Sequence, residues 1–192
     1  MAWKILSINP GSTSTKIAIY RNLDEEFTFT IRHSIEELKK YDRIFDQYDF
    51  RKQIIIESIE KADFDIKTIN AVVGRGGLVR PIPSGVYRVN SKMLDDLRNE
   101  VYGEHASNLG AILSYEIAKE IGPAVPSFIA DPVVVDELDE IARISGHPEL
   151  PRVSIFHALN QKAVARRFAR EQGKNLVDLN LVVVHLGGGI TV

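Results

Sequence analysis

The chain contains no cysteine, has nearly balanced charge and lacks any long apolar run. The absence of cysteine excludes disulfides, thiolate nucleophiles and cysteine-based zinc sites, and it is compatible with any redox compartment. The 24 basic and 26 acidic residues leave a net charge of −2, which argues against the basic surface that binds nucleic acid or anionic membranes. No apolar run approaches the roughly eighteen residues of a membrane span, and no cleavable signal pattern opens the chain. We therefore expect a soluble cytoplasmic protein without nucleic-acid or membrane partners.

The 192 residues, 44% of them hydrophobic, can bury the core of one domain or slightly more. Residues 4–20 are the most informative segment, because two strand-like apolar runs flank a turn at residues 9–15. This turn, Asn-Pro-Gly-Ser-Thr-Ser-Thr, precedes Lys16, so backbone N–H groups, hydroxyls and a positive charge could hold a phosphate there. The same residue types form ordinary tight turns, and that alternative stays open at this point. The pattern of a Walker phosphate loop is absent.

The order of the expected elements indicates a fold class. Three strands are expected in residues 4–8, 16–20 and 26–33, and a capping box at Ser34 opens a helix after them. The elements that follow are a helix at 50–62, a strand at 69–73, helices at 91–100 and 106–121, and a strand at 126–130. This βββαβαβ order predicts an α/β, ribonuclease H-like domain of the kind shared by actin, the heat-shock ATPases and sugar kinases.

A shorter set of elements follows residue 131. After a helical patch, residues 145–152 are the best linker candidate. Residues 154–161 lead into a helix ending near Gln172, and a buried-strand pattern at 179–184 runs into His185 and three consecutive glycines. Glycines at this place would let the backbone approach a phosphate closely. We therefore expect a first domain in residues 1–150, and in residues 151–192 the truncated beginning of a second ribonuclease H-like domain.

Five short motifs follow one another along the chain. They are Asn9–Lys16, Gly74-Arg75-Gly76-Gly77, Ala130-Asp131-Pro132, Phe156-His157 and His185-Leu186-Gly187-Gly188-Gly189. In this order and at these separations, they resemble the acetate and butyrate kinase family over essentially the whole chain. The details favour the butyrate kinase branch, because acetate kinases usually have Asn-Ala-Gly-Ser-Ser-Ser in the first turn. Acetate kinases also have a second histidine in the fourth motif, where this chain has Gln161.

The resemblance implies reversible transfer of the γ-phosphoryl group from ATP to a short-chain carboxylate such as butyrate, giving an acyl phosphate and ADP, with Mg²⁺ required. It also implies a homo-oligomer. The implied catalytic residues are Arg75 at the phosphoryl oxygens or the carboxylate, His157 donating a hydrogen bond in the transition state, and Asp131 orienting Arg75 or acting on Mg²⁺ through water. The implied phosphate-binding residues are Asn9, Ser12, Ser14, Lys16, His185, Gly187, Gly188 and Gly189. No side chain is assigned as a direct metal ligand.

Each assignment has a structural alternative. Arg75 could be a solvated or ion-paired loop residue, the histidines hydrogen-bonded core residues, and Asp131 the cap of a following helix. We interpret His33 and His147 as surface or linker residues, whereas His105 could cap the next helix or line the carboxylate pocket. Related acids should be accepted with graded preference, because each added methylene contributes about 0.8 kcal/mol on burial. The expected apolar wall for the alkyl tail is formed by Pro81, Ile82, Pro83 and Val86.

By the same resemblance, family members are built from two such domains, and this chain corresponds to about the first half. We expect the remaining part to bind adenosine and to supply a second arginine and an acidic Mg²⁺ ligand, so the chain alone would be inactive or nearly so. The alternative is a non-catalytic binding or oligomer-interface module. A sugar kinase-like regulator is disfavoured, because there is no DNA-binding helix-turn-helix pattern and no basic patch. An unpaired hairpin near Val192 would expose apolar surface, which predicts self-association.

Overall fold

The computed structural model describes residues 2–186 and 190–191 of the chain, which divides into two compact units. Unit 1 comprises Met1–Arg80 and Gly85–Ala130, and unit 2 comprises Pro81–Ser84 and Asp131–Val192. The expected boundary at residue 150 stays a prediction. Three glycines of the last predicted motif, residues 187–189, and also residue 192 lie outside the described residues.

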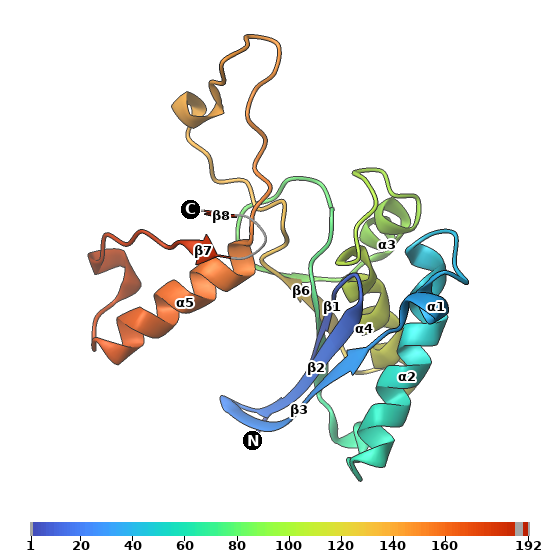
Figure 1. The fold of residues 1–192 in the computed structure, drawn as a ribbon. Helices are drawn as coiled ribbons and strands as arrows, with labels where there is room; N and C mark the ends of the chain where they lie inside the picture. The colour runs from blue at the N-terminus through green and yellow to red at the C-terminus, as the bar shows by residue number, and fades with distance from the viewer. Residues whose placement is uncertain (1, 187–189, 192) are drawn as a thin grey trace. The chain divides into compact units, whose positions relative to one another are not determined.

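Unit 1 is built on a six-stranded sheet (Figure 1). Its strands are β1 (Lys4–Pro10), β2 (Ser14–Arg21), β3 (Asp24–Arg32), β4 (Ala71–Arg75), β5 (Val86–Arg88) and β6 (Ser127–Ala130), in the spatial order β3-β2-β1-β4-β6-β5. Strands β1, β2 and β3 pair as an antiparallel meander, and β4 and β6 continue the sheet parallel to β1. The short β5 pairs antiparallel with β6 at the edge. This arrangement confirms the predicted α/β, ribonuclease H-like class.

Helices cover one face of this sheet (Figure 1). They are α1 (Ile35–Leu38), α2 (Tyr48–Lys61), α3 (Ser91–Arg98) and α4 (Asn108–Ile121). Helix α4 packs on β1, β4 and β6, and α2 packs on α4 and β3. The predicted capping box is present, because the Ser34 hydroxyl accepts from the Glu37 N–H and the Glu37 carboxylate accepts from the Ser34 N–H. The buried core is aliphatic and includes Leu6, Ile8, Ile17, Ile19, Ile55, Ile59, Leu109, Ile112 and Leu113.

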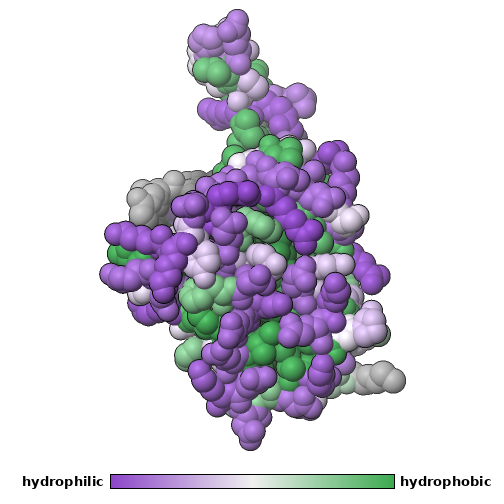
Figure 2. Space-filling view, turned by 90° about the vertical axis from the view of Figure 1, so that its right-hand side faces the viewer, coloured by the Kyte–Doolittle hydropathy of each residue, from purple (hydrophilic) through white to green (hydrophobic). Residues whose placement is uncertain are grey.

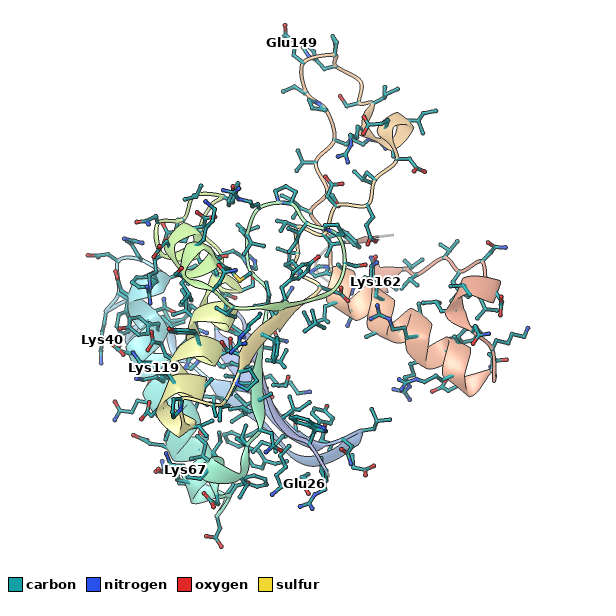
Figure 3. All side chains as sticks on the ribbon, turned by 180° about the vertical axis from the view of Figure 1, so that it is seen from behind. Glu26, Lys40, Lys67, Lys119, Glu149 and Lys162 are labelled. Atoms are coloured by element: carbon teal, nitrogen blue, oxygen red, sulfur yellow. The ribbon has the colours of Figure 1, made fainter. Side chains whose placement is uncertain are left out.

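The carboxyl end of α4 is fixed by Lys67, which belongs to the short 3-10 helix Ile66–Thr68. Lys67 donates its ammonium hydrogens to the carbonyl oxygens of Glu120 (3.1 Å) and Ile121 (3.2 Å). A cation at this position satisfies terminal carbonyls and interacts favourably with the helix dipole. Figure 3 labels Lys67 and also Lys119, which belongs to α4 itself. Figure 2 shows hydrophilic side chains over most of the displayed face, with apolar patches between them.

Unit 2 contains one long helix, α5 (Ala158–Glu171), and a small hairpin of β7 (His185–Leu186) and β8 (Ile190–Thr191). Residues 81–84 join it through a parallel bridge between Ile82 and Val135. The hydroxyl of Ser154 donates to the Val135 carbonyl at 2.6 Å, which closes a long arm at residues 136–153. The predicted helical patch in this arm is a short 3-10 helix, Glu140–Arg143.

Two expectations about elements are corrected by the structure. Residues 179–184 form no strand, and Val182 and Val184 are 80% and 51% exposed, because the described part of unit 2 offers this segment no neighbouring strand to pair with. Strand β5 was not predicted from the sequence. Its three residues, Val-Tyr-Arg, are too few to form a recognisable alternation.

Candidate functional site

Three of the predicted site residues lie on one face of the sheet in unit 1. Asn9 and Lys16 are directly opposite each other in the β1–β2 pair. In the parallel β1–β4 pair, Ile8 is opposite Gly74, so Asn9 and Arg75 follow side by side at the carboxyl ends of their strands. The Nη1 of Arg75 lies 3.5 Å from Oδ1 of Asn9, at the long limit of a hydrogen bond. Asn9 and Lys16 are exposed and Arg75 is half-buried, and the two cationic residues lie on the strands either side of β1, which carries Asn9.

This cluster lies on the face that the helices leave open. Leu6 and Ile8 alternate with Asn9 along β1 and are buried, because they point toward the helical layer. Arg75 shares the face of Asn9, whereas Gly74 faces α4. Burial lowers the pKa of the Arg75 guanidinium from its usual value. Open parallel sheets commonly bind ligands at the carboxyl ends of their strands, which is where Arg75 lies.

The glycines around Arg75 serve helix packing. A Cβ on Gly74 would lie 1.9 Å from the carbonyl oxygen of Gly110 in α4, and one on Gly77 would lie 2.5 Å from the Cα of Asn108. Only glycine permits so close an approach of helix and strand. The Asn108 side chain fixes the loop further by accepting from the Leu78 N–H at 2.8 Å. The glycines therefore position the arginine through the main chain.

The turn between β1 and β2 presents its tip to solvent. The N–H of Gly11 donates to the Ser14 carbonyl at 2.7 Å, and the N–H of His33 donates to the Thr13 carbonyl at 2.9 Å. Ser12 and Thr13 are exposed. Within the part of the chain that the structure describes, neither of their N–H groups donates to a protein acceptor. These two amides and the exposed Lys16 are available to bind an anion.

Two buried residues under this turn were missed or misplaced by sequence reasoning. His33 is only 5% exposed, so its interpretation as a surface residue is wrong; its Nε2 shares a 2.9 Å hydrogen bond with the Thr15 hydroxyl. Burial, and next the nearby Arg51 charge, lower the pKa of His33 to about 4. Arg51 is 1% exposed and donates to the turn from α2. A signal existed, because Arg51, Ile55 and Ile59 share the buried stripe of this helix.

Three of the predicted site residues in unit 2 are described by the structure. The rings of His157 and His185 stack with centroids 4.3 Å apart and planes inclined by 18°. His157 immediately precedes α5, and His185 Nδ1 lies 3.3 Å from Asn160 Oδ1 on the first turn of that helix. The carboxylate of Asp131 is paired with Arg166, with Oδ2 and Nη1 3.5 Å apart.

Asp131 has an unusual backbone for an aspartate. It is 5% exposed and has φ of +34°, in the left-handed region that non-glycine residues adopt uncommonly. Such conformations concentrate at functional sites. No helix follows it within residues 131–139, where Val135 donates its N–H to the Pro132 carbonyl, so the helix-cap alternative is wrong. That Asp131 orients Arg75 stays a prediction.

The secondary candidates also have defined places. His105 accepts through Nδ1 from the Ser107 N–H at 3.1 Å; Ser107 is the N-cap residue of α4, and the two alternatives for His105 stay predictions. His147 is exposed, as expected. The Nε2 of Gln161 is buried without a hydrogen-bond acceptor among the described residues. The proposed apolar wall stays a prediction.

Two further findings concern the described residues as a whole. No cluster of three or more histidine or acidic side chains among them could hold a metal ion. No helix within the same residues has both the length and the apolar character needed to cross a membrane.

The chain was compared with known proteins. No family model matches it. Butyrate kinase 1 of Clostridium acetobutylicum is 61% identical over 190 residues, which cover 99% of this chain and 53% of the relative. A probable butyrate kinase of Clostridium botulinum (strain Eklund 17B) is 55% identical over 192 residues, covering all of this chain and 54% of the relative. The chain therefore spans about half the length of the curated relatives it matches.

Solved structures agree on the fold. The acetate kinase of Porphyromonas gingivalis superposes with a TM-score of 0.70 at 12% identity, over 98% of this chain and 53% of that one. A propionate kinase from Francisella tularensis gives a TM-score of 0.61 at 14% identity, over 98% and 53%. At such low identity these likenesses establish the fold alone. Along its whole length the chain is similar in sequence to proteins named butyrate kinase, of which it spans about half, and its fold is that of the acetate and propionate kinases.

Proposed function

We propose that this chain serves in the reversible transfer of the γ-phosphoryl group of ATP to the carboxylate of butyrate or another short-chain acid, giving an acyl phosphate and ADP. The observation that carries the proposal is the cluster of Asn9, Lys16 and Arg75 beside the open tip of the first turn. The names of the curated relatives support the same reaction class.

The chemistry needs cations and hydrogen-bond donors more than it needs a base. A carboxylate is already ionised at neutral pH, so it can attack without losing a proton. Catalysis then consists of aligning two anions and neutralising the charge on the transferring phosphoryl group. The planar fork of Arg75 can bind two oxygens of either anion at once. Its half-buried position makes that interaction stronger than it would be in bulk water.

The turn at residues 9–15 is the proposed holder of nucleotide phosphate. The outward N–H groups of Ser12 and Thr13, the hydroxyls of Ser12 and Ser14, and the ammonium of Lys16 are all suitable donors to phosphate oxygens. Mg²⁺ would arrive with the nucleotide and neutralise charge on its phosphates. We assign no protein side chain as its direct ligand.

For unit 2 we propose that His157 donates a hydrogen bond to the transferring phosphoryl group and that His185 contributes to nucleotide-phosphate binding. Their stacked rings restrict each other's rotation, which supports a fixed direction for both donors. Asp131 is proposed to act on Arg75 or, through water, on Mg²⁺. We also propose that the chain forms a homo-oligomer and acts in the cytoplasm, where ATP is abundant.

The experiment that tests this function is an acyl phosphate assay on the chain with ATP, Mg²⁺ and butyrate, in which hydroxylamine traps the product. Arg75→Ala should lower product formation by about a hundredfold or more, the loss typical of a transition-state donor. Arg80→Ala is the matched control, because Arg80 is 56% exposed in its side chain and is paired only loosely with Asp96 at 3.8 Å. Equal activity of the Arg75→Ala variant would contradict the proposal.

The chain alone could also form no product, because it spans about half of its relatives. Calorimetric binding of butyryl phosphate then becomes the deciding measurement. We expect binding that is lost in Arg75→Ala and kept in Arg80→Ala. The absence of any Arg75-dependent binding of butyryl phosphate would overturn the proposal.

A further inference from the structure

A fully buried arginine lies directly beneath the first turn. Arg51, on the first half of α2, has an exposed fraction of 1%. Its guanidinium donates to three main-chain carbonyl oxygens of the turn, those of Gly11 (2.8 Å), Ser12 (3.1 Å) and Ser14 (3.3 Å). Three carbonyls of one short turn are thus held by a single planar group from a helix about forty residues away in the sequence.

The guanidinium also contacts two side-chain acceptors, and its two Nη1 hydrogens serve three oxygens. Arg51 Nη1 donates to the Thr15 hydroxyl oxygen at 3.1 Å, and Nε and Nη2 donate to Gln47 Oε1 at 3.1 Å and 2.8 Å. Gln47 is itself 7% exposed, one helical turn before Arg51. All three nitrogens are therefore bound, and the group has one defined orientation.

This arrangement dictates where the amides of the turn point. In a planar trans peptide, the carbonyl and the N–H of the same unit point in opposite directions. The carbonyls of Gly11 and Ser12 point inward to Arg51, so the N–H groups of Ser12 and Thr13, in the same two peptide units, point away from it. These are the two amides that have no acceptor within the described residues.

The buried charge of Arg51 has no carboxylate partner in the described part of the chain. Its acceptors are carbonyl, amide and hydroxyl oxygens, and no ion pair involves it. Burial lowers the pKa of Arg51 to about 10, which still leaves it protonated at neutral pH. A buried charge is costly unless an opposite charge balances it. An anion at the tip of the turn would provide that balance.

We propose that Arg51 is a positioning residue for phosphate: it holds the carbonyls of the turn inward, directs the Ser12 and Thr13 amides outward, and supplies a buried positive charge beneath the bound anion. This inference rests in part on the proposed function, because it assigns the same turn to nucleotide phosphate. It adds a residue from α2, outside all five motifs, to that site.

Substitution Gln47→Glu separates this role from a purely structural one. The glutamate keeps an oxygen acceptor for Arg51 Nε and Nη2 and adds a negative charge that neutralises the guanidinium. If Arg51 only braced the turn, the variant would fold at least as well and bind phosphate as before. Under the proposal it folds, but the dissociation constant for inorganic phosphate rises about tenfold, as expected for loss of one nearby charge in a partly buried site.

The readout is the backbone amide shifts of Ser12 and Thr13 during titration of the chain with inorganic phosphate. Arg51→Met should abolish these shifts, and Arg51→Lys should recover binding only in part, because a lysine keeps the charge but loses the fork. Ile59→Ala is the matched control: it removes a fully buried side chain two turns further along the same helix, so it lowers stability without touching the turn. Its phosphate affinity should equal that of the unmodified chain.

Two results would overturn the inference: no shift of the Ser12 and Thr13 amides in the unmodified chain, or undiminished phosphate affinity in Gln47→Glu. Both can be read without the Arg51 variants, so a misfolded Arg51→Met protein does not remove the test. Phosphate binding of the expected kind without acyl phosphate chemistry would leave this inference standing and count against the proposed function. Kinase activity of the chain together with unchanged phosphate binding in Gln47→Glu would support the proposed function and overturn this inference.

Discussion

Gly110 of helix α4 lies directly against the main chain of Arg75 at the end of strand β4. A Cβ on Gly110 would lie 2.0 Å from the Arg75 carbonyl oxygen, and one on the neighbouring Gly74 would lie 1.9 Å from the Gly110 carbonyl oxygen. Helix and strand therefore meet backbone to backbone at the residue proposed to contact the phosphoryl group. Helix α4 fixes the main chain of Arg75, and the Arg75 side chain stays free to bind a ligand.

Gly110→Ala should therefore destabilise the chain even though alanine is the better helix former. Backbone atoms cannot move aside as a side chain would, so we expect a loss of about 3 kcal/mol in the free energy of unfolding. Urea denaturation measures this loss. Gly122→Ala is the control, because a Cβ there would meet nothing within 4 Å, and its effect should stay within about 0.5 kcal/mol. A stable Gly110→Ala protein would mean that α4 packs less closely on β4 than described.

The buried His33 should make stability depend on pH between about 6.5 and about 4. Its pKa in the folded chain is about 4, lowered from 6.5 by burial and by the Arg51 charge, so the folded state resists protonation. The unfolded state binds the proton first as the pH falls, so stability is present above pH 6.5 and is lost progressively toward pH 4. Urea denaturation midpoints measured at intervals across this pH range test whether stability falls as the pH falls.

His33→Gln should flatten this dependence, because it removes the titrating ring. The variant should also be less stable at pH 7, since the ring packs against Phe50 with centroids 5.5 Å apart. His147→Gln, at an exposed position in unit 2, should leave the slope unchanged. An equal slope in the His33→Gln chain would show that other groups cause the acid sensitivity.

Much of the fold could be predicted because local signals and tertiary structure agree in unit 1. The capping box at Ser34, the turn after Asn9 and the alternation along β3 are each set by neighbouring residues. The segment at 179–184 shows the limit of such signals. Its apolar run has the composition of a buried strand, but burial requires partners that no local pattern can supply.

The candidate site was predictable where sheet order alone decides proximity. Asn9 and Arg75 follow matched residues of two parallel strands, so their adjacency follows from the predicted order. Arg51 and His33 could not be placed in this way, because an arginine in a helix is usually exposed and only the tertiary contact with the turn buries it. The packing role of Gly74 and Gly77 could not be predicted either, because it depends on contacts with α4 that no local pattern supplies.

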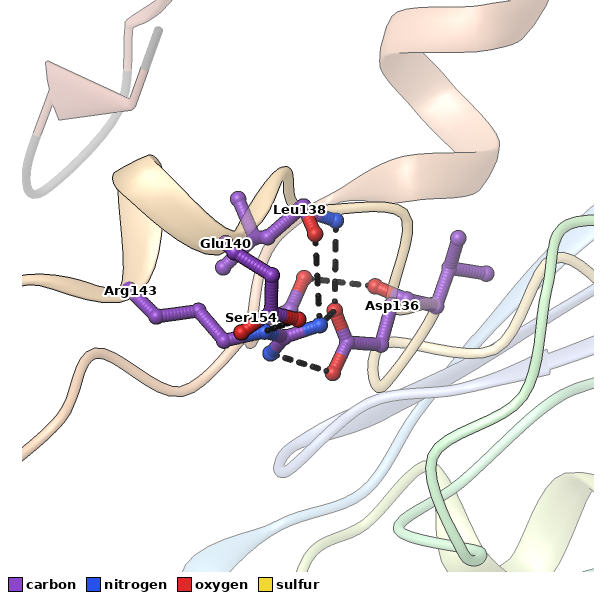
Figure 4. Close-up of polar contacts among 6 residues, drawn as sticks. Asp136, Leu138, Glu140, Arg143 and Ser154 are labelled. Atoms are coloured by element: carbon purple, nitrogen blue, oxygen red, sulfur yellow. Dashed lines mark hydrogen bonds and ion pairs between the residues drawn. The ribbon is translucent and has the colours of Figure 1, made fainter.

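The arm at residues 136–153 should depend on one arginine for its local order. Arg143 donates to both carboxylate oxygens of Asp136, at 2.9 Å and 3.0 Å, and to the Leu138 carbonyl at 3.3 Å (Figure 4). Arg143→Ala should speed thermolysin cleavage near the exposed Ile141 and Ile144 about fivefold, with little change in global stability. Arg152→Ala, an exposed arginine of the same arm, should leave the rate unchanged. Equal cleavage of the two variants would show that the pair does not order the arm.

Glu137 should stabilise unit 2 in a lower pH range than His33 stabilises unit 1. It accepts from Lys162 of α5 at 2.6 Å and from the Ser84 N–H at 2.9 Å, so it ties residues 81–84 and α5 together. The Lys162 hydrogen bond, followed by those from Ser84, lowers the pKa of Glu137 from 4.5 to about 2. Because the folded pKa is depressed, the contribution is complete above pH 4.5 and is lost as the pH falls toward 2.

Solvent reaches this carboxylate, because the Glu137 side chain is 45% exposed. Glu137→Gln should therefore lower the free energy of unfolding by only about 1 kcal/mol at pH 7. The difference between the variant and the unmodified chain should shrink as the pH falls from 4.5 toward 2, because protonation removes the same charge from the unmodified chain. Thermal unfolding at several pH values measures it. Glu171→Gln, which removes an exposed pair with Arg167 on the surface of α5, should show a smaller difference. A Glu137→Gln difference that stays constant down to pH 2 would show that the charge of this carboxylate does not cause the difference.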